Sequence, residues 1–117
     1  MTAPNTLSIT TVNAKTALGT LTTVTSNVIV NGASSNAVVK VNTIMVNNYS
    51  ASSILANVFI TRSSVQYFIA GNVSVPGYST LFILGKDSAT YLEEGDWLQA
   101  NVSANVAQIS SSYELIS

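Results

Sequence analysis

The sequence has no histidine and no cysteine, and its only charged side chains are four basic and five acidic residues among 117. Proton transfer and covalent catalysis need groups whose pKa can be tuned toward the working pH, and His and Cys supply these most often. We therefore expect no enzyme activity, no catalytic residue, no cofactor and no bound metal. Disulfides cannot stabilise the fold, so its stability must come from packing and, we expect, oligomerisation.

Long apolar runs are also missing, although the mean hydropathy is +0.39. The apolar residues occur in short runs, whereas a membrane-spanning helix needs about 20 in succession. The first residues also lack the basic and apolar segments of a secretory signal. A net charge of −1 with dispersed basic residues argues against phosphate binding. We expect neither a membrane nor a nucleic acid as partner.

Neutral polar residues take the place of charge, since Ser, Thr and Asn together make up more than a third of the chain. Weak net charge gives little colloidal repulsion between copies. This composition favours a protein that contacts other surfaces within an assembly.

Segments rich in Val, Ile and Thr recur between Asn, Gly, Ser and Pro, which is typical of a β-sandwich or barrel. The fold class predicted is all-β, an antiparallel and jelly-roll-like sandwich. The clearest expected strands are Ala37 to Asn47, Ile54 to Arg62, Val65 to Ala70, Thr80 to Leu84, Trp97 to Ala104 and Gln108 to Leu115. Shorter candidates are Leu7 to Val12, Leu18 to Val24 and Val28 to Val30.

The first part of the chain, residues 1–25, is Thr-rich, and residues 26–117 are expected to form the sandwich domain. Two interpretations of residues 1–25 stay open. They form an extended N-terminal arm that completes a neighbour's sheet by strand addition, or an ordinary first strand of the same domain.

Period-two alternation assigns faces to two of these strands. In the strand that begins at Trp97, alternation places Leu98, Ala100, Val102 and Ala104 in the core. Trp97 then points outward. In Ile54 to Ile60, one face is aliphatic, and the other carries Leu55 and Phe59. A strand that is apolar on both sides is either covered by a second layer or part of a subunit contact.

Turn signals separate the expected strands. Asn31-Gly32 predicts a hairpin, Pro76-Gly77 a type II turn, and Gly71-Asn72 a break between strands.

The most specific local segment is Tyr91 to Leu98, in which an apolar pair enters an acidic turn and a strand leaves it. Gly95 can adopt positive φ, and Asp96 can accept hydrogen bonds from nearby backbone N–H groups. Glu93, Glu94 and Asp96 could bind Ca²⁺, but three acids in four residues lack the spacing of a dedicated loop. We expect an acidic, solvated turn.

The acidic turn leading through Gly-Asp into a strand resembles the penultimate connection of jelly-roll sandwiches. A wider resemblance covers about Val38 to Ile116. Its motifs are Val41 to Asn48, Tyr67 to Pro76, Ser79-Thr80-Leu81, Tyr91 to Asp96 and Ser112-Tyr113-Glu114. Together these motifs resemble the small β-rich virion structural proteins of tailed bacteriophages, found among head-decoration, neck and tail accessory proteins. Trp97 stands where that pattern has a small polar residue.

The resemblance implies a non-enzymatic virion protein, assembled in the host cytoplasm, that decorates the capsid. Its partners would be the major capsid protein or tail and neck proteins, together with further copies of itself, as in a trimer. Neck, tail or baseplate attachment is the alternative, as is a receptor- or glycan-binding module that uses exposed aromatic residues. The candidate interface residues are Trp97, Phe59, Tyr91 and Leu55.

Overall fold

The computed structural model describes residues 11–85 and 89–117, and these ranges contain nine β-strands and no helix. The part of the chain that is described thus offers no helical segment able to cross a membrane. The strands are β1 (Val12–Leu21), β2 (Ser26–Val30), β3 (Val38–Asn48), β4 (Ile54–Arg62), β5 (Val65–Val75), β6 (Thr80–Leu84), β7 (Thr90–Leu92), β8 (Trp97–Val102) and β9 (Ala107–Ile116).

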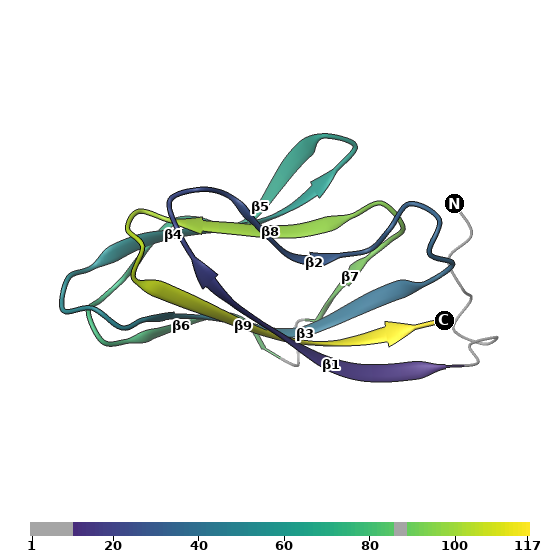
Figure 1. Cartoon of the computed structure of the whole chain (residues 1–117), viewed down its shortest axis with the longest axis horizontal. Coiled ribbons are helices and arrows are strands. Elements are labelled where there is room, and N and C mark those ends of the chain that lie inside the picture. Colours follow the sequence, from purple (N-terminus) through teal and green to yellow (C-terminus); the bar gives the residue numbers. More distant parts are fainter. Residues whose placement is uncertain (1–10, 86–88) are drawn as a thin grey trace.

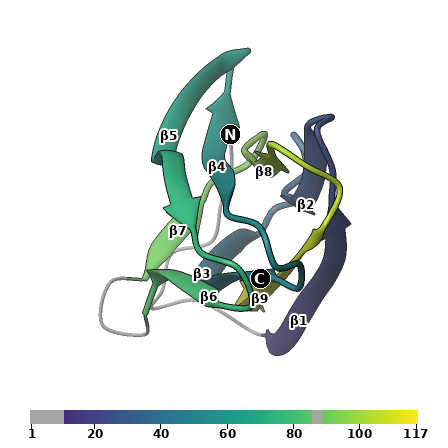
Figure 2. The same ribbon diagram turned by 90° about the vertical axis from the view of Figure 1, so that its left-hand side faces the viewer.

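The strands form two antiparallel sheets that pack face to face (Figures 1 and 2). Sheet A has the order β1-β9-β3-β6, and the short β7 also pairs with β3. Sheet B has the order β2-β8-β4-β5. The predicted all-β antiparallel sandwich is confirmed.

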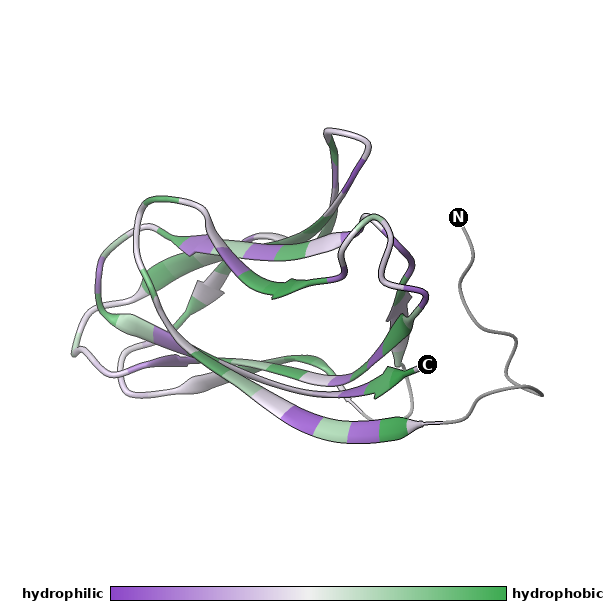
Figure 3. Ribbon diagram, turned by 45° about the vertical axis from the view of Figure 1, so that its right-hand side comes forward, coloured by the Kyte–Doolittle hydropathy of each residue, from purple (hydrophilic) through white to green (hydrophobic). Residues whose placement is uncertain are grey.

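The core lies between the two sheets and is built by alternation along each strand (Figure 3). Leu98, Ala100 and Val102 of β8 are buried, while Trp97 points outward. Ile54, Ala56 and Val58 of β4 are buried in the same core. Alternation therefore assigned the inward face of both strands correctly.

Several strand boundaries agree with the sequence prediction. The expected Ile54 to Arg62 and Thr80 to Leu84 coincide with β4 and β6. Between Arg62 and Val65, Ser63 and Ser64 form a two-residue hairpin turn, with φ of 52° and 63°. Positive φ at both positions is the geometry of a type I′ turn, which matches the twist of the strands it joins.

The N-terminal region differs from the expected strand Leu18 to Val24. β1 instead begins at Val12 and pairs with β9 along its whole length, from Val12 opposite Ile116 to Leu21 opposite Ala107. Residues 12–21 are thus the first strand of the sandwich. Residues 1–10, which include most of the expected strand Leu7 to Val12, lie outside the described residues, and an arm there stays a prediction.

The break predicted at Gly71-Asn72 is wrong, because β5 continues through both residues to Val75. The pairing with β4 shifts there, and Asn72 adopts φ of 50°. Its backbone N–H donates to Oδ1 of Asn57 at 2.8 Å. The Gly-Asn signal therefore marks a β-bulge within a strand.

The hairpin predicted at Asn31-Gly32 is also wrong. β2 pairs with β8 in sheet B, whereas the strand after Gly32, β3, belongs to sheet A. Asn31 is buried, and its Nδ2 donates to the carbonyl oxygens of Ala37 and Leu92, both at 3.0 Å. The connection crosses between the sheets and is fixed by this amide.

Pro76-Gly77 does form a turn, but it is not of type II. A type II turn needs positive φ at the glycine, whereas here the residue with positive φ is Tyr78, at 54°. Gly77 is required for space instead, because a Cβ there would lie 2.2 Å from the backbone oxygen of Ala51. The backbone at Gly77 therefore packs closely against Ala51, which brings the β5–β6 turn against the β3–β4 connection.

The close approach at Gly77 yields a stability test. Gly77→Ala should lower the free energy of unfolding by about 1–3 kcal/mol, because backbone must move to admit the methyl group. Gly32→Ala is the matched control, since its Cβ would meet nothing within 4 Å. Urea unfolding of both variants measures the difference, and equal midpoints would contradict the close approach.

Candidate functional site

The acidic turn predicted from the sequence lies between β7 and β8 and connects sheet A to sheet B. Gly95 has φ of +86°, as expected, and the Asp96 N–H donates to the Glu93 carbonyl at 3.0 Å. Asn31 pairs with this turn through two backbone bonds. It accepts from the Gly95 N–H at 2.9 Å and donates to the Asp96 carbonyl at 3.0 Å.

The expectation that this turn is solvated is wrong at Asp96, which is 1% exposed. The Arg62 guanidinium donates to both oxygens of the Asp96 carboxylate. Nε donates to Oδ1 at 2.7 Å, and Nη2 donates to Oδ2 at 2.6 Å. The Glu93 N–H also donates to Oδ2, at 2.8 Å. A bidentate, charge-assisted pair of this kind is among the stronger polar contacts in proteins.

Arg62 reaches Asp96 because β4 and β8 are neighbours in sheet B, with Thr61 opposite Trp97. Sequence analysis missed this partner, which lies 34 residues away from Asp96. The only available signal was that Arg62 is the last residue of a strand expected from the sequence.

The outer part of the same corner is more open. Arg62 Nη2 also contacts Oε2 of Glu93 at 3.0 Å, where both side chains are about half exposed. Glu94 is nearly buried, and its Oε2 accepts from the Asn36 N–H at 3.2 Å. The hydrogen bond to Asp96 is the main cause that raises the pKa of Arg62 above its usual value, although burial acts in the opposite direction. Arg62 therefore stays charged throughout the pH range of a folded protein.

We call Arg62, Glu93, Glu94 and Asp96 the charged corner. Its ion pairs connect the end of β4 to the β7–β8 turn. Both oxygens of the Asp96 carboxylate are engaged by protein donors, and Arg62 occupies the position a cation would take. Across residues 11–85 and 89–117, no group of three or more His, Cys, Asp or Glu side chains could hold a metal ion. The geometry fits structural support, since the buried carboxylate of Asp96 is fully engaged by protein donors.

The other described charges lie in the same half of the molecule. Lys40 and Glu114 are opposite each other on β3 and β9, and Lys15 lies opposite Tyr113 near the start of β1. Lys86 and Asp87 fall in the segment that the structure does not describe.

The described connections at the opposite end of the sandwich contain no Asp, Glu, Lys or Arg. Its four connections span residues 22–25, 49–53, 76–79 and 103–106. They are bonded to one another: Oδ1 of Asn105 accepts from the Thr23 N–H at 3.0 Å, and the Ser50 carbonyl accepts from the Tyr78 N–H at 2.9 Å. We call this region the uncharged end. It exposes Val24 and Tyr78 at 71% and 74%.

The four predicted interface residues do not share one surface. Trp97 and Leu55 are exposed on the outer face of sheet B, and Tyr91 is exposed on β7 of sheet A. Phe59 is only 1% exposed, and its ring centroid lies 5.1 Å from that of Phe68 on β5. Phe59 is therefore a packing residue beneath Phe68 and is not available to a partner.

Neutral hydrogen bonds cover the outer face of sheet B around Trp97. The Gln99 amide donates to Oδ1 of Asn27 at 2.7 Å, and the Asn57 amide donates to Oδ1 of Asn101 at 3.0 Å. Thr61 donates to Oε1 of Gln99. These cross-strand pairs give the face a fixed, polar and uncharged surface.

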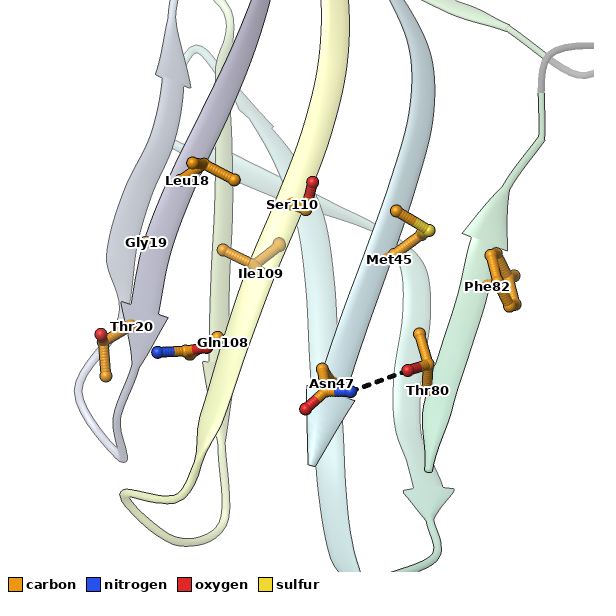
Figure 4. A pocket seen from close by; sticks show the side chains of 10 residues that line it. All are labelled: Leu18, Gly19, Thr20, Met45, Asn47, Thr80, Phe82, Gln108, Ile109 and Ser110. Atoms are coloured by element: carbon orange, nitrogen blue, oxygen red, sulfur yellow. Dashed lines mark hydrogen bonds between the residues drawn. The ribbon is translucent and has the colours of Figure 1, made fainter. Parts of the chain in front are cut away.

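A groove of about 620 Å³ lies on sheet A, toward the uncharged end (Figure 4). Two cross-strand rows of side chains line it. The first row is mainly apolar and consists of Leu18, Ser110, Met45 and Phe82, from β1 to β6. The second is polar and consists of Thr20, Gln108, Asn47 and Thr80. Sequence analysis did not identify this groove, because its members come from four strands that are far apart in the chain.

Comparisons with protein-family models, curated proteins and solved structures found no match to this chain. Functional inference therefore rests on the residues and their geometry.

The charged corner allows a matched mutational test. Asp96→Asn should lower the free energy of unfolding by about 2 kcal/mol, because the buried carboxylate loses its charge-assisted hydrogen bonds to the half-exposed Arg62. Glu93→Gln removes the same charge from the same arginine at a half-exposed position, and should cost less than about 1 kcal/mol. Denaturant unfolding of both variants measures the contrast, and similar losses would show that Asp96 is not the essential partner.

Proposed function

We propose that this protein is a non-enzymatic structural subunit of a bacteriophage virion, and specifically a decoration protein bound to the capsid surface. The observation that carries the proposal is the distribution of charge. The described Asp, Glu, Lys and Arg side chains gather in one half, and the described residues of the uncharged end and of the outer face of sheet B include none of them. Such surfaces suit permanent contacts made by shape, apolar patches and neutral hydrogen bonds.

The contacts of Asp96 and Glu94 support the non-enzymatic part of the proposal. Asp96 is saturated by Arg62 and the Glu93 N–H, and Glu94 accepts from the Asn36 N–H. General acid–base catalysis needs a positioned group that can exchange a proton with substrate. The corner therefore supports a structural role better than an enzymatic one.

The strand order supports the jelly-roll part of the proposal. β1, β3 and β6 lie in sheet A, and β2, β4 and β5 lie in sheet B. β9 inserts between β1 and β3, and β8 inserts between β2 and β4, giving β1-β9-β3-β6 and β2-β8-β4-β5. A jelly roll likewise consists of eight strands in two sheets, so this arrangement supports the proposal. The fold is common to many functions, so it agrees with a virion role without selecting one.

Assembly would use two features of this sandwich. Neutral contacts at the uncharged end and at Trp97 would fix the subunit on the capsid with little dependence on salt. The outer edge of β1 is free of a strand partner within the described sheets, so it could accept a strand from a neighbouring copy in a trimer.

Two alternatives belong to the same proposal. Attachment at the neck, tail or baseplate would use the same surfaces, and the short chain without a fibrous repeat favours the head. A glycan-binding platform that combines Trp97 with Tyr91 is disfavoured, because these residues lie on different sheets.

Cryo-microscopy of virions of a phage whose genome encodes this chain tests where the protein lies on the particle. We expect density of this sandwich on the head, in contact with the major capsid protein, and lost from particles of a deletion mutant. Purified protein added to the mutant particles should restore it. Density on the tail or neck alone would refute decoration, and its absence from the whole particle would refute the virion assignment.

A further inference from the structure

The groove on sheet A is not among the surfaces proposed for assembly. Its two rows lie side by side across four strands, so one flank is apolar and the other can form hydrogen bonds (Figure 4). Leu18 and Phe82, at the two ends of the apolar row, are 78% and 71% exposed. Ser110 lies between the longer side chains of Leu18 and Met45. With strands about 4.8 Å apart, the row spans about 14 Å.

The side chains of the polar row have donors and acceptors that can bond to a ligand. Among the described residues, the Gln108 amide and the Thr20 hydroxyl have no partner within the protein. Asn47 Nδ2 donates to Thr80 Oγ1 at 2.8 Å, which leaves the Asn47 carbonyl as an acceptor and the Thr80 hydroxyl as a donor. Donors and acceptors of both kinds thus face the groove.

Ionisable side chains are absent from the ten residues that line the groove. An anionic or cationic ligand would find no opposite charge there to offset its desolvation. An entirely apolar ligand, or an apolar segment of a second copy, would bury Gln108 and Asn47 without partners. The matching ligand is neutral and has an apolar face next to hydroxyl groups.

We propose that this groove binds a neutral oligosaccharide. The ring of Phe82, with Met45 and Leu18, contacts the C–H face of a sugar ring. Gln108, Thr20 and the Asn47–Thr80 pair exchange hydrogen bonds with its hydroxyl groups. The volume of about 620 Å³ is that of a small-molecule site. This inference stands independently of the virion assignment, since it rests on the groove alone.

Isothermal titration calorimetry with neutral hexasaccharides tests the proposal, using oligomers of glucose, mannose, galactose, xylose and N-acetylglucosamine. At least one should bind, with an affinity that is unchanged by added salt. Phe82→Ala and Gln108→Ala should each weaken binding by about tenfold, the equivalent of one lost contact. Phe82→Tyr should retain binding, and Trp97→Ala, on the other sheet, should have no effect.

Both substituted groove residues are exposed, so equal thermal unfolding of the variants and the parent is the folding control. Four results would overturn the proposal. They are no binding of any neutral hexasaccharide, binding of anionic heparin fragments alone, binding that Phe82→Ala and Gln108→Ala leave unchanged, and a protein dimer that dissociates on Phe82→Ala. The last result would assign the groove to contact between copies of this chain.

Discussion

The ion pair between Arg62 and Asp96 is the contact on which the arrangement of loops at one end of the sandwich depends. A carboxylate that is 1% exposed would be very costly without a partner, and the guanidinium supplies two hydrogen bonds to it. Through Asp96 the end of β4 is tied to the turn that carries the chain from sheet A to sheet B. Asn31 binds that same turn and the start of β3, so three connections are fixed together.

This use of charge has consequences for the rest of the surface. The chain has nine charged side chains, and four of those that the structure describes lie in the charged corner. Stability elsewhere comes from aliphatic packing between the sheets and from neutral side-chain pairs such as Asn57 with Asn101. On the proposed function, the outer face of sheet B and the uncharged end contact partners through shape and neutral hydrogen bonds. Contacts of this kind lose little when salt screens charges, which suits a permanent assembly.

Local features of the fold could be predicted from the sequence. Alternating apolar residues gave the inward faces of β4 and β8, and the glycine of the acidic turn has the positive φ expected of it. These properties depend on residues adjacent in the chain. The two-residue turn at Ser63-Ser64 was located by the ends of its strands, although it lacks the Asn-Gly signal typical of type I′ turns.

Features that depend on distant residues could not be predicted in this way. Arg62 as the partner of Asp96, the close approach of Gly77 to Ala51 and the covering of Phe59 by Phe68 all arise from sheet pairing or loop packing. Phe59 shows the limit clearly, because alternation placed it on the outer face but could not show that a bulged neighbouring strand covers it. The groove likewise exists only after β1, β9, β3 and β6 are placed side by side.

The native mass of the purified protein, measured by sedimentation equilibrium from about 0.05 to about 1 M NaCl, tests the central claim that it assembles through neutral surfaces. The account predicts a defined homo-oligomer whose mass does not change across this range. A monomer at every salt concentration, or an oligomer that dissociates as salt is added, would contradict it.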